Sequence, residues 1–233
     1  MKAVKLATSL AVALLAAAPF ASFAQDEETP LINWSIAATS DYVWRGSSQS
    51  DENPTGQVGL TFNLPAGFYA GGWASGVDFG DGDPDFEVDY YVGYNVDFSD
   101  SVNFDVMLNR YTYPGASELN FNELITKTTF VDTYSLTVAY ANDFGGSDAK
   151  AWYVNGGASF GLPQDFSLDL GVGRSLFDDG VGMEDYTDWS VGVSRSFGMV
   201  SASLGYVGTD GNGRDNFGRL ADDRVVLTLS VGN

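Results

Sequence analysis

Apolar and polar residues alternate with a period of two along most of the chain from residue 33 onward. Between Phe86 and Val96, apolar or aromatic residues occupy the even positions, whereas Glu87, Asp89 and Asn95 occupy odd ones. Because successive side chains of a β-strand point to opposite faces, this pattern predicts a strand with one apolar and one polar face. About twelve such segments follow one another, so the sequence predicts an all-β chain.

The connections between the predicted strands are alternately long and short. The long connections are 46–54, 80–85, 114–120, 143–150, 177–186 and 210–222, and the short ones are 65–67, 97–100, 131–133, 161–165 and 198–199. An even number of strands of about ten residues, with short turns at one end and long loops at the other, is typical of transmembrane antiparallel up-and-down β-barrels. We therefore expect a barrel of about 12 strands, with short periplasmic turns and longer, acidic extracellular loops.

A soluble β-sandwich or lipocalin-type barrel would also alternate, with its apolar face turned inward. The predicted strands are longer than the usual soluble strand of about 5–6 residues. Aromatic residues gather at strand ends, as in the interfacial girdles of membrane barrels. Those expected near the short turns are Trp34, Tyr69, Tyr94, Tyr134, Phe160 and Phe197, and those near the long loops are Trp44, Phe79, Phe86, Tyr140, Trp152 and Trp189. These features favour the membrane barrel.

The first residues resemble a secretory signal peptide. Lys2 and Lys5 precede an apolar run from Leu6 to Phe20, and the small residues Ser22 and Ala24 stand before a cleavage point. A membrane-spanning helix would need about 20 apolar residues. Export of the remaining chain places the predicted barrel in the outer membrane of a Gram-negative bacterium. The predicted organisation is a signal peptide over 1–24, a periplasmic N-terminal segment over 25–32 and a barrel over 33–233.

Composition excludes several classes of function. The chain has no Cys and no His, and its 11 basic residues face 31 acidic ones, for a formal charge of −20. Without Cys or His, the chain lacks the usual Ser-His and Cys-His catalytic groups and the usual zinc ligands. Nucleic-acid binding requires clusters of Lys and Arg that this acidic chain lacks. We expect no enzyme activity, no cofactor and no nucleic-acid partner.

One acidic run partly matches a calcium-binding loop. Asp81, Asp83 and Asp85 occupy positions one, three and five of such a loop, but Phe86 stands at the position of its glycine and Val92 at that of its last glutamate. The run is therefore expected to be a solvated acidic turn, and no metal site is predicted.

The polar face of the predicted strands carries an excess of carboxylates. The residues expected to line the lumen are Asp41, Arg45, Asp78, Glu87, Asp89, Asp105, Asn109, Glu123, Lys127, Asp169, Asp188 and Arg224. Rings of Asp and Glu favour the passage of cations. Eight-stranded barrels are filled by side chains, whereas 16–18 strands leave an aqueous channel. Twelve strands lie between these cases, so both an open channel and a plugged lumen remain compatible with the sequence.

Three arginines fall on the apolar parity near predicted strand ends: Arg110, Arg174 and Arg195. A long basic side chain at such a position can extend to the membrane interface, where a charge costs about 0–1 kcal/mol. Interfacial placement is the simpler interpretation. For Arg110 and Arg174, near the long loops, contact with the phosphates of lipopolysaccharide is the other.

Three stretches are similar to a family of proteobacterial outer-membrane proteins. The segment from Ser40 to Asp51, with the sequence SDYVWRGSSQSD, resembles the S-D-Y-V-[FW]-R-G-x-S-Q-S/T stretch of the TorF-like porins, a family of poorly defined function. Gly67–Ser75 and Glu87–Tyr94 are similar to the strands that follow it. The resemblance implies an outer-membrane barrel of porin type, and it brings no catalytic residues.

The function that the sequence predicts is passive diffusion of small solutes through an outer-membrane channel, with a modest preference for cations. The alternative is a non-conducting structural or adhesive barrel. The expected partners are outer-membrane lipid, lipopolysaccharide and small solutes or ions. The pattern indicates neither the solute nor the oligomeric state.

Overall fold

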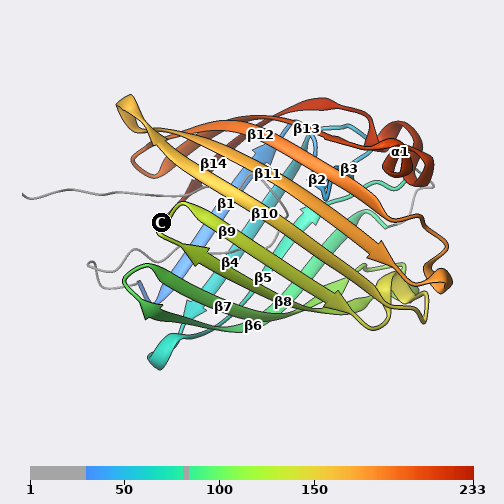
Figure 1. Ribbon diagram of the computed structural model, residues 1–233, viewed down its shortest axis with the longest axis horizontal. Helices are drawn as coiled ribbons and strands as arrows, with labels where there is room; N and C mark the ends of the chain where they lie inside the picture. Colours follow the sequence, from blue (N-terminus) through green and yellow to red (C-terminus); the bar gives the residue numbers. More distant parts are fainter. Residues whose placement is uncertain (1–29, 81–83) are drawn as a thin grey trace, which may run out of the picture.

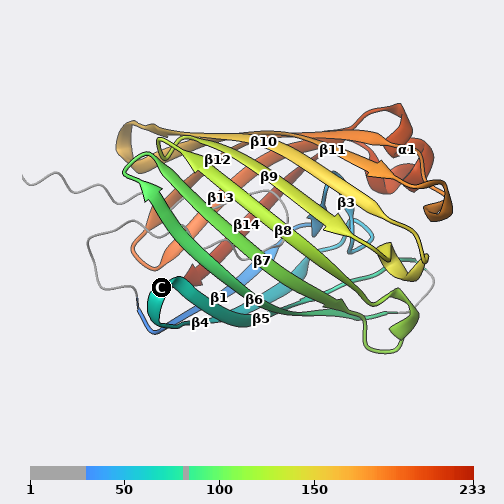
Figure 2. The same ribbon diagram turned by 60° about the horizontal axis from the view of Figure 1, so that its bottom comes forward.

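The computed structural model, which describes residues 30–80 and 84–233, is a closed antiparallel barrel (Figures 1 and 2). The predicted signal peptide, most of the segment 25–32 and part of the acidic run at 81–85 lie outside the described residues. The barrel strands are β1 Ile32–Thr39, β4 Thr55–Asn63, β5 Phe68–Gly76, β6 Phe86–Ser99, β7 Val102–Thr112, β8 Phe121–Phe130, β9 Tyr134–Ala141, β10 Ala151–Leu162, β11 Phe166–Phe177, β12 Tyr186–Phe197, β13 Val200–Thr209 and β14 Arg224–Gly232. This confirms the predicted fold class.

Each barrel strand pairs with its neighbours in sequence, and β1 closes the sheet by pairing with both β4 and β14. The side chain of Asn233 extends this seam, accepting a hydrogen bond from the Trp34 backbone N–H at 2.9 Å and donating to the Ile32 carbonyl at 3.1 Å. Closure matters because lipid cannot satisfy the backbone groups of an open strand edge.

Short turns occupy one end of the barrel and long connections the other, as the sequence predicts. In Figure 1 the C-terminus lies at the short-turn end, and the helix α1, Gly211–Phe217, lies at the other. The 3-10 turns are η1 Pro65–Gly67, η2 Ser117–Leu119, η3 Phe144–Gly146, η4 Pro163–Asp165, η5 Asp179–Val181 and η6 Gly218–Ala221. No helix in the described ranges is long and apolar enough to cross a membrane.

The predicted turn at 97–100 differs from the structure, because β6 continues to Ser99 and pairs with β7 beyond it. The register shifts between Asp97 and Ser99, which is the mark of a bulge. A bulge adds a residue to one strand without ending the ladder. The side-chain alternation is interrupted there, so the pattern indicates a turn three residues too early.

The outside of the barrel is apolar along its middle. Exposed side chains there include Leu108 at 49%, Leu136 at 44% and Leu204 at 54% of their full accessible surface. The opposite parity carries buried polar side chains such as Glu87 and Asp169, at 2% and 8% exposure. This arrangement is the reverse of a soluble barrel and matches a surface in contact with lipid.

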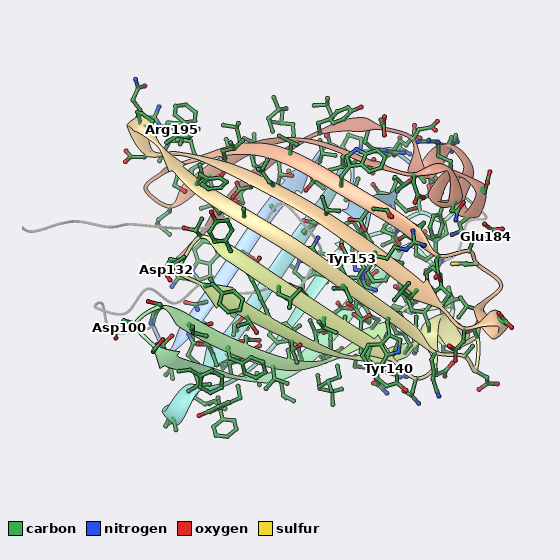
Figure 3. The ribbon with its side chains drawn as sticks, viewed as in Figure 1. Asp100, Asp132, Tyr140, Tyr153, Glu184 and Arg195 are labelled. Atoms are coloured by element: carbon green, nitrogen blue, oxygen red, sulfur yellow. The ribbon has the colours of Figure 1, made fainter. Side chains whose placement is uncertain are left out.

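Aromatic pairs mark both ends of the outer surface. Tyr134 packs edge-on against Phe160 at 6.2 Å between ring centroids, near the short turns. Near the long loops, Tyr140 packs on Trp152 at 4.5 Å. Figure 3 places Tyr140 and Arg195 toward opposite ends of the barrel.

Three of the predicted girdle residues lie inside the barrel instead. Tyr69 is 6% exposed and donates to the Asp105 carboxylate at 2.7 Å. Trp44 and Phe79 pack against the interior cluster of buried residues. The girdle prediction was therefore wrong for these three, because a period-two pattern shows that two faces differ without showing which face points inward.

Two of the three arginines on the outer face, Arg195 and Arg174, have protein partners. The Arg195 guanidinium lies over the rings of Phe166 and Phe197, 4.9 and 4.7 Å from their centroids. Arg174 donates to the Thr187 hydroxyl at 3.0 Å and lies 3.5 Å from a carboxylate oxygen of Asp210. Loop carboxylates thus partly neutralise Arg174.

We predict that the position of a charge along β13 controls its cost. Leu204→Arg, halfway along the strand, should destabilise the barrel by about 2–4 kcal/mol, whereas Val200→Arg, beside the short turn, should cost about 0–1 kcal/mol. Both side chains are exposed on the outer face. Urea unfolding of the barrel in lipid vesicles measures the difference. Equal costs for the two variants would contradict a lipid-facing surface.

Candidate functional site

The connection between β1 and β4 folds into the barrel rather than away from it. We call residues 40–54 the inner hairpin. It contains two short strands, β2 Val43–Trp44 and β3 Ser47–Ser48. The first long connection predicted from the sequence, 46–54, implies a first strand that continues to Arg45; this was wrong, because β1 ends at Thr39. Tyr42 shares the parity of Trp34 and Trp44, which the sequence assigned to the outer, aromatic girdles, but it is buried at 3% exposure.

The tip of the inner hairpin is the two-residue turn Arg45-Gly46. Both residues have positive φ angles, 48° and 81°. Two positive φ values are the signature of a type I′ turn, which joins antiparallel strands through two residues. A Cβ atom on Gly46 would lie 2.5 Å from Thr209 Cγ2 and 3.1 Å from the Gly208 carbonyl oxygen. Glycine therefore allows both the turn and its close approach to the wall at β13.

The Arg45 side chain reaches across the lumen. Its Nη2 donates to both carboxylate oxygens of Glu123 on β8, at 2.8 Å each. On the other side, the Tyr186 hydroxyl of β12 donates to the Arg45 carbonyl at 2.9 Å. The guanidinium carbon lies 4.2 Å from the ring centroids of both Trp44 and Tyr153. One residue thus connects strands β8, β10 and β12 through the barrel interior.

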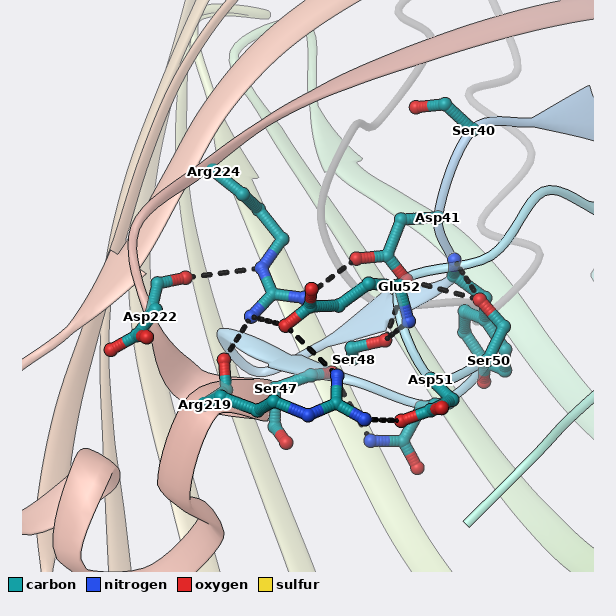
Figure 4. A network of polar contacts seen from close by, with 12 residues as sticks. Ser40, Asp41, Ser47, Ser48, Ser50, Asp51, Glu52, Arg219, Asp222 and Arg224 are labelled. Carbon is teal, nitrogen blue, oxygen red and sulfur yellow. Dashed lines mark hydrogen bonds and ion pairs between the residues drawn. The ribbon is translucent and has the colours of Figure 1, made fainter. Parts of the chain in front are cut away.

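Asp41 holds the two limbs of the inner hairpin together (Figure 4). Its Oδ1 accepts hydrogen bonds from the hydroxyls of Ser48, at 2.6 Å, and Ser50, at 3.0 Å. Its Oδ2 accepts from Nη1 of Arg224 on β14, at 2.8 Å. The Ser50 hydroxyl also accepts from the Tyr42 backbone N–H at 2.9 Å. This carboxylate therefore attaches the hairpin to β14, the strand that pairs with β1 in the barrel wall.

The outer rim of the inner hairpin contacts the last long connection, 210–223. Arg219 pairs with Asp51 and lies 3.3 Å from a Glu52 carboxylate oxygen. Arg224 also reaches Glu52, at 3.5 Å. The hydrogen bond and charge of Asp51 raise the pKa of Arg219. Because Arg219 is 57% exposed, water and salt screen its pairs with Asp51 and Glu52, and each contributes little stability.

Apart from Glu123, the buried carboxylates of the strands are hydrogen-bonded to neutral side chains. Glu87 accepts from the Tyr42 hydroxyl at 3.0 Å, and Asp89 accepts from the Asn109 amide at 3.0 Å. Further partners are Tyr69 for Asp105 at 2.7 Å, Tyr153 for Asp188 at 3.1 Å, and Ser159 and Ser194 for Asp169 at 2.7 and 3.2 Å. Such bonds offset the cost of removing the carboxylates from bulk water.

Most of the predicted lumen residues do point into the barrel. Those buried there are Asp41, Arg45, Glu87, Asp89, Asp105, Asn109, Glu123, Asp169 and Asp188. Lys127 stands directly opposite Asp105 in the β7–β8 register, and Arg224 reaches inward to Asp41. Asp41 and Arg45 lie on the inner hairpin, not on the first strand.

Asp78 departs from the prediction. The sequence predicts a strand that continues to Phe79, but β5 ends at Gly76 and the Asp78 side chain is exposed. Its backbone N–H instead donates to the Gln49 carbonyl of the inner hairpin at 2.8 Å. The strand therefore stops where its chain turns to pair with the inner hairpin.

Sequence reasoning missed the tyrosines that surround Arg45. Tyr153 and Tyr186 are 4% and 2% exposed, and both lie within the barrel. Both stand on the polar parity of their strands, next to the outward-facing Trp152 and Thr187. A tyrosine on the polar face was the available signal, since its hydroxyl can bond to a lumen carboxylate while its ring fills space.

The sequence from residue 25 to residue 231 matches the model of a family described as "Bacterial protein of unknown function (Gcw_chp)". A search of curated proteins finds no match. The fold is similar to that of the KdgM porin in complex with disordered oligogalacturonate, with a TM-score of 0.57, 7% identity and coverage of 86% of this chain and 98% of that one. It is similar also to the NanC porin, with a TM-score of 0.57, 10% identity and coverage of 85% and 97%. At these identities the likeness shows a common fold.

We predict that Gly46→Ala weakens the barrel. The new methyl group would meet Thr209 and the β13 backbone, and alanine at a positive φ costs about 1–2 kcal/mol. The midpoint of urea unfolding in lipid vesicles should fall. Gly211→Ala is the matched control, since Gly211 has no atom within 4 Å of its Cβ position. An unchanged midpoint for Gly46→Ala would show that the tip does not pack on β13.

A double-mutant cycle should reveal strong coupling between Arg45 and Glu123. Arg45→Met or Glu123→Leu alone leaves an unpaired buried charge and should cost about 3–5 kcal/mol. The double variant should cost much less than the sum of the two. Unfolding free energies of all four proteins, measured in the same vesicles, give the coupling. Strict additivity would contradict a direct ion pair.

Proposed function

The chain belongs to the Gcw_chp family of bacterial proteins, and we propose that it is an outer-membrane channel of porin type, narrowed by its inner hairpin. The observation that carries this proposal is a polar, hydrogen-bonded lumen inside an apolar outer surface. Twelve strands lie between eight-stranded barrels, which side chains fill, and 16–18-stranded barrels, which leave an aqueous channel, and this barrel holds the inner hairpin in its lumen. The similarity of fold to the KdgM and NanC porins and the resemblance to TorF-like porins support the same function. The proposal involves no catalytic step.

We further propose that the channel prefers cations modestly. The described interior holds more carboxylates than basic side chains: Asp41, Glu87, Asp89, Asp105, Glu123, Asp169 and Asp188, compared with Arg45, Lys127 and Arg224. Two carboxylates are neutralised directly, by the Arg45–Glu123 and Arg224–Asp41 pairs. The others are hydrogen-bonded to neutral donors, and Lys127 stands opposite one of them, Asp105; the negative field that is left acts on a passing ion.

The proposed location follows from the outer surface together with the predicted signal peptide. Strands with an apolar outer face and closed backbone pairing suit a bilayer. Outer-membrane lipid would contact the apolar band, and lipopolysaccharide would contact the rim of the long loops, where Arg174 is partly neutralised by Asp210.

One observation favours the second candidate, a non-conducting structural barrel. The inner hairpin crosses the lumen, and Arg45 and Glu123 are only 5% and 1% exposed there. If the remaining space beside the hairpin is too small for hydrated ions, the barrel would be closed in its resting state. The two candidates make different predictions for conductance.

The test is single-channel recording of the protein in a planar bilayer. We expect a small, steady conductance for the natural chain and a larger one for the double variant Arg45→Ala/Glu123→Ala, which removes the side chains that cross the lumen without leaving a buried charge unpaired. Lys150→Ala, which changes a basic residue in a long connection, is the control and should conduct as the natural chain does.

The outcomes separate the candidates. Conductance in the double variant but not in the natural chain would support the closed barrel. If neither protein conducts at high salt, the channel is excluded. Reversal potentials in a salt gradient test selectivity, where preference for anions would overturn the assignment of the acidic lumen.

A further inference from the structure

A cavity of about 280 Å³ lies between the inner hairpin and the long connections. Its floor includes Trp44 and Arg45 of the hairpin. Each of the remaining long connections contributes at least one apolar side chain to its wall. These side chains are Phe79 from 77–85, Tyr113 and Leu119 from 113–120, Phe144 from 142–150, Val181 and Met183 from 178–185, and Phe217 from 210–223. We call this cavity the vestibule. Loops that are acidic in sequence thus turn apolar side chains toward one shared space.

Aromatic rings form a continuous path around the vestibule. Phe144 stacks on Trp44 at 6.1 Å with 11° between ring planes, and it contacts Phe177 at 5.4 Å. Phe177 packs on Tyr186 at 6.1 Å, and Tyr186 meets Phe217 of α1 edge-on at 5.5 Å. These contacts fix the rings relative to one another, so the vestibule is a pre-formed site. Pre-formed, mostly apolar cavities with a few polar groups are typical binding sites for small molecules.

The polar groups of the lining include no carboxylate. Besides Arg45 they are the hydroxyls of Ser47, Ser147, Ser175, Tyr113 and Tyr186, the Gln49 amide and the Trp44 indole N–H. The Arg45 Nη2 is engaged by Glu123, but its buried Nε has no hydrogen-bond partner among the described residues. Because that Nε has almost no accessible surface, a ligand in the cavity would bond instead to the neutral hydroxyl and amide groups of the lining. The lining therefore favours a ligand with one hydrogen-bonding oxygen.

Charge and volume limit the ligand further. The Arg45 cation already occupies the face of Trp44, at 4.2 Å, and disfavours a second cation in the same space. Acidic residues of the surrounding loops disfavour anions. The volume is at the lower limit of known ligand pockets, about 300 Å³, which suits a single ring.

We propose that the vestibule binds neutral, single-ring aromatic compounds that carry one hydrogen-bonding oxygen, such as phenols. This inference goes beyond the proposed channel, because binding requires the folded loops and does not require that the lumen conducts. If the channel conducts, the vestibule would concentrate such compounds at its outer entrance.

The test is isothermal titration of the full barrel in lipid nanodiscs, which avoid free detergent as a competitor, with p-cresol as the probe. We expect saturable binding at one site. Phe144→Ala and Phe177→Ala should each weaken it about tenfold, equivalent to about 1.4 kcal/mol. Phe98→Ala is the matched control, because Phe98 is 68% exposed at the end of β6 and stacks on Phe104, away from the vestibule. It should bind as the natural chain does.

Related probes test the chemistry of the ligand. Toluene lacks the oxygen and cyclohexanol lacks the aromatic ring, so both should bind several-fold more weakly than p-cresol. Tighter binding of benzoate or choline would overturn the neutral assignment. Absence of saturable binding, or equal affinity in the Phe144 and Phe98 variants, would overturn the site itself.

The variants must be folded for this comparison. A shift in gel mobility on heating reports the intact barrel, and Phe217→Ala, in the last connection, replaces either variant that fails to fold. Conductance is recorded on the same proteins. Binding without conductance would contradict the proposed channel and support the proposed ligand site in the vestibule. Conductance without binding would support the channel and contradict the ligand site.

Discussion

The ion pair between Arg45 and Glu123 determines where the inner hairpin lies. Burying two charges is costly, and a pair of hydrophobic residues of similar size can be as stable. The pair therefore sets the orientation of the hairpin more than it stabilises the barrel, since Arg45 can bond to Glu123 only when the hairpin points across the lumen. The contacts of Gly46 with β13 and of Tyr186 with the Arg45 carbonyl depend on the same orientation. Without it, the vestibule would lose its floor.

The period-two pattern was sufficient to predict the barrel. Twelve strands, the alternation of long and short connections and most of the inward carboxylates follow from which parity is polar. Glu87, Asp105 and Asp169 were found this way, because a carboxylate cannot face lipid cheaply and must point inward. The limits of each strand were less certain, as the bulge near Asp97 shows.

The inward fold of the inner hairpin was not predicted from the sequence, and the reason is physical. Tyr42 and Trp44 alternate with polar neighbours as they would on a strand that faces lipid, but their apolar side chains pack inside the barrel. Local alternation cannot distinguish the two environments, because the partners of these side chains lie on distant strands. The available local signal was Arg45-Gly46, where a glycine permits the positive φ of a tight turn. The vestibule could not be predicted for the same reason, since its apolar side chains come from six separate connections.

The two attachments of the inner hairpin differ in strength, and this difference constrains how a solute can pass. At the tip, the ion pair with Glu123 is almost wholly buried, so withdrawing Arg45 from it would cost about 3–5 kcal/mol. At the rim, Asp51 and Glu52 meet Arg219 in solvent, where water and salt screen each pair and make it weak. Thermal motion therefore loosens the rim far more often than the tip. A solute that crosses this barrel would pass beside a fixed Arg45, and the size of that space, more than any swing of the hairpin, would set which solutes are admitted.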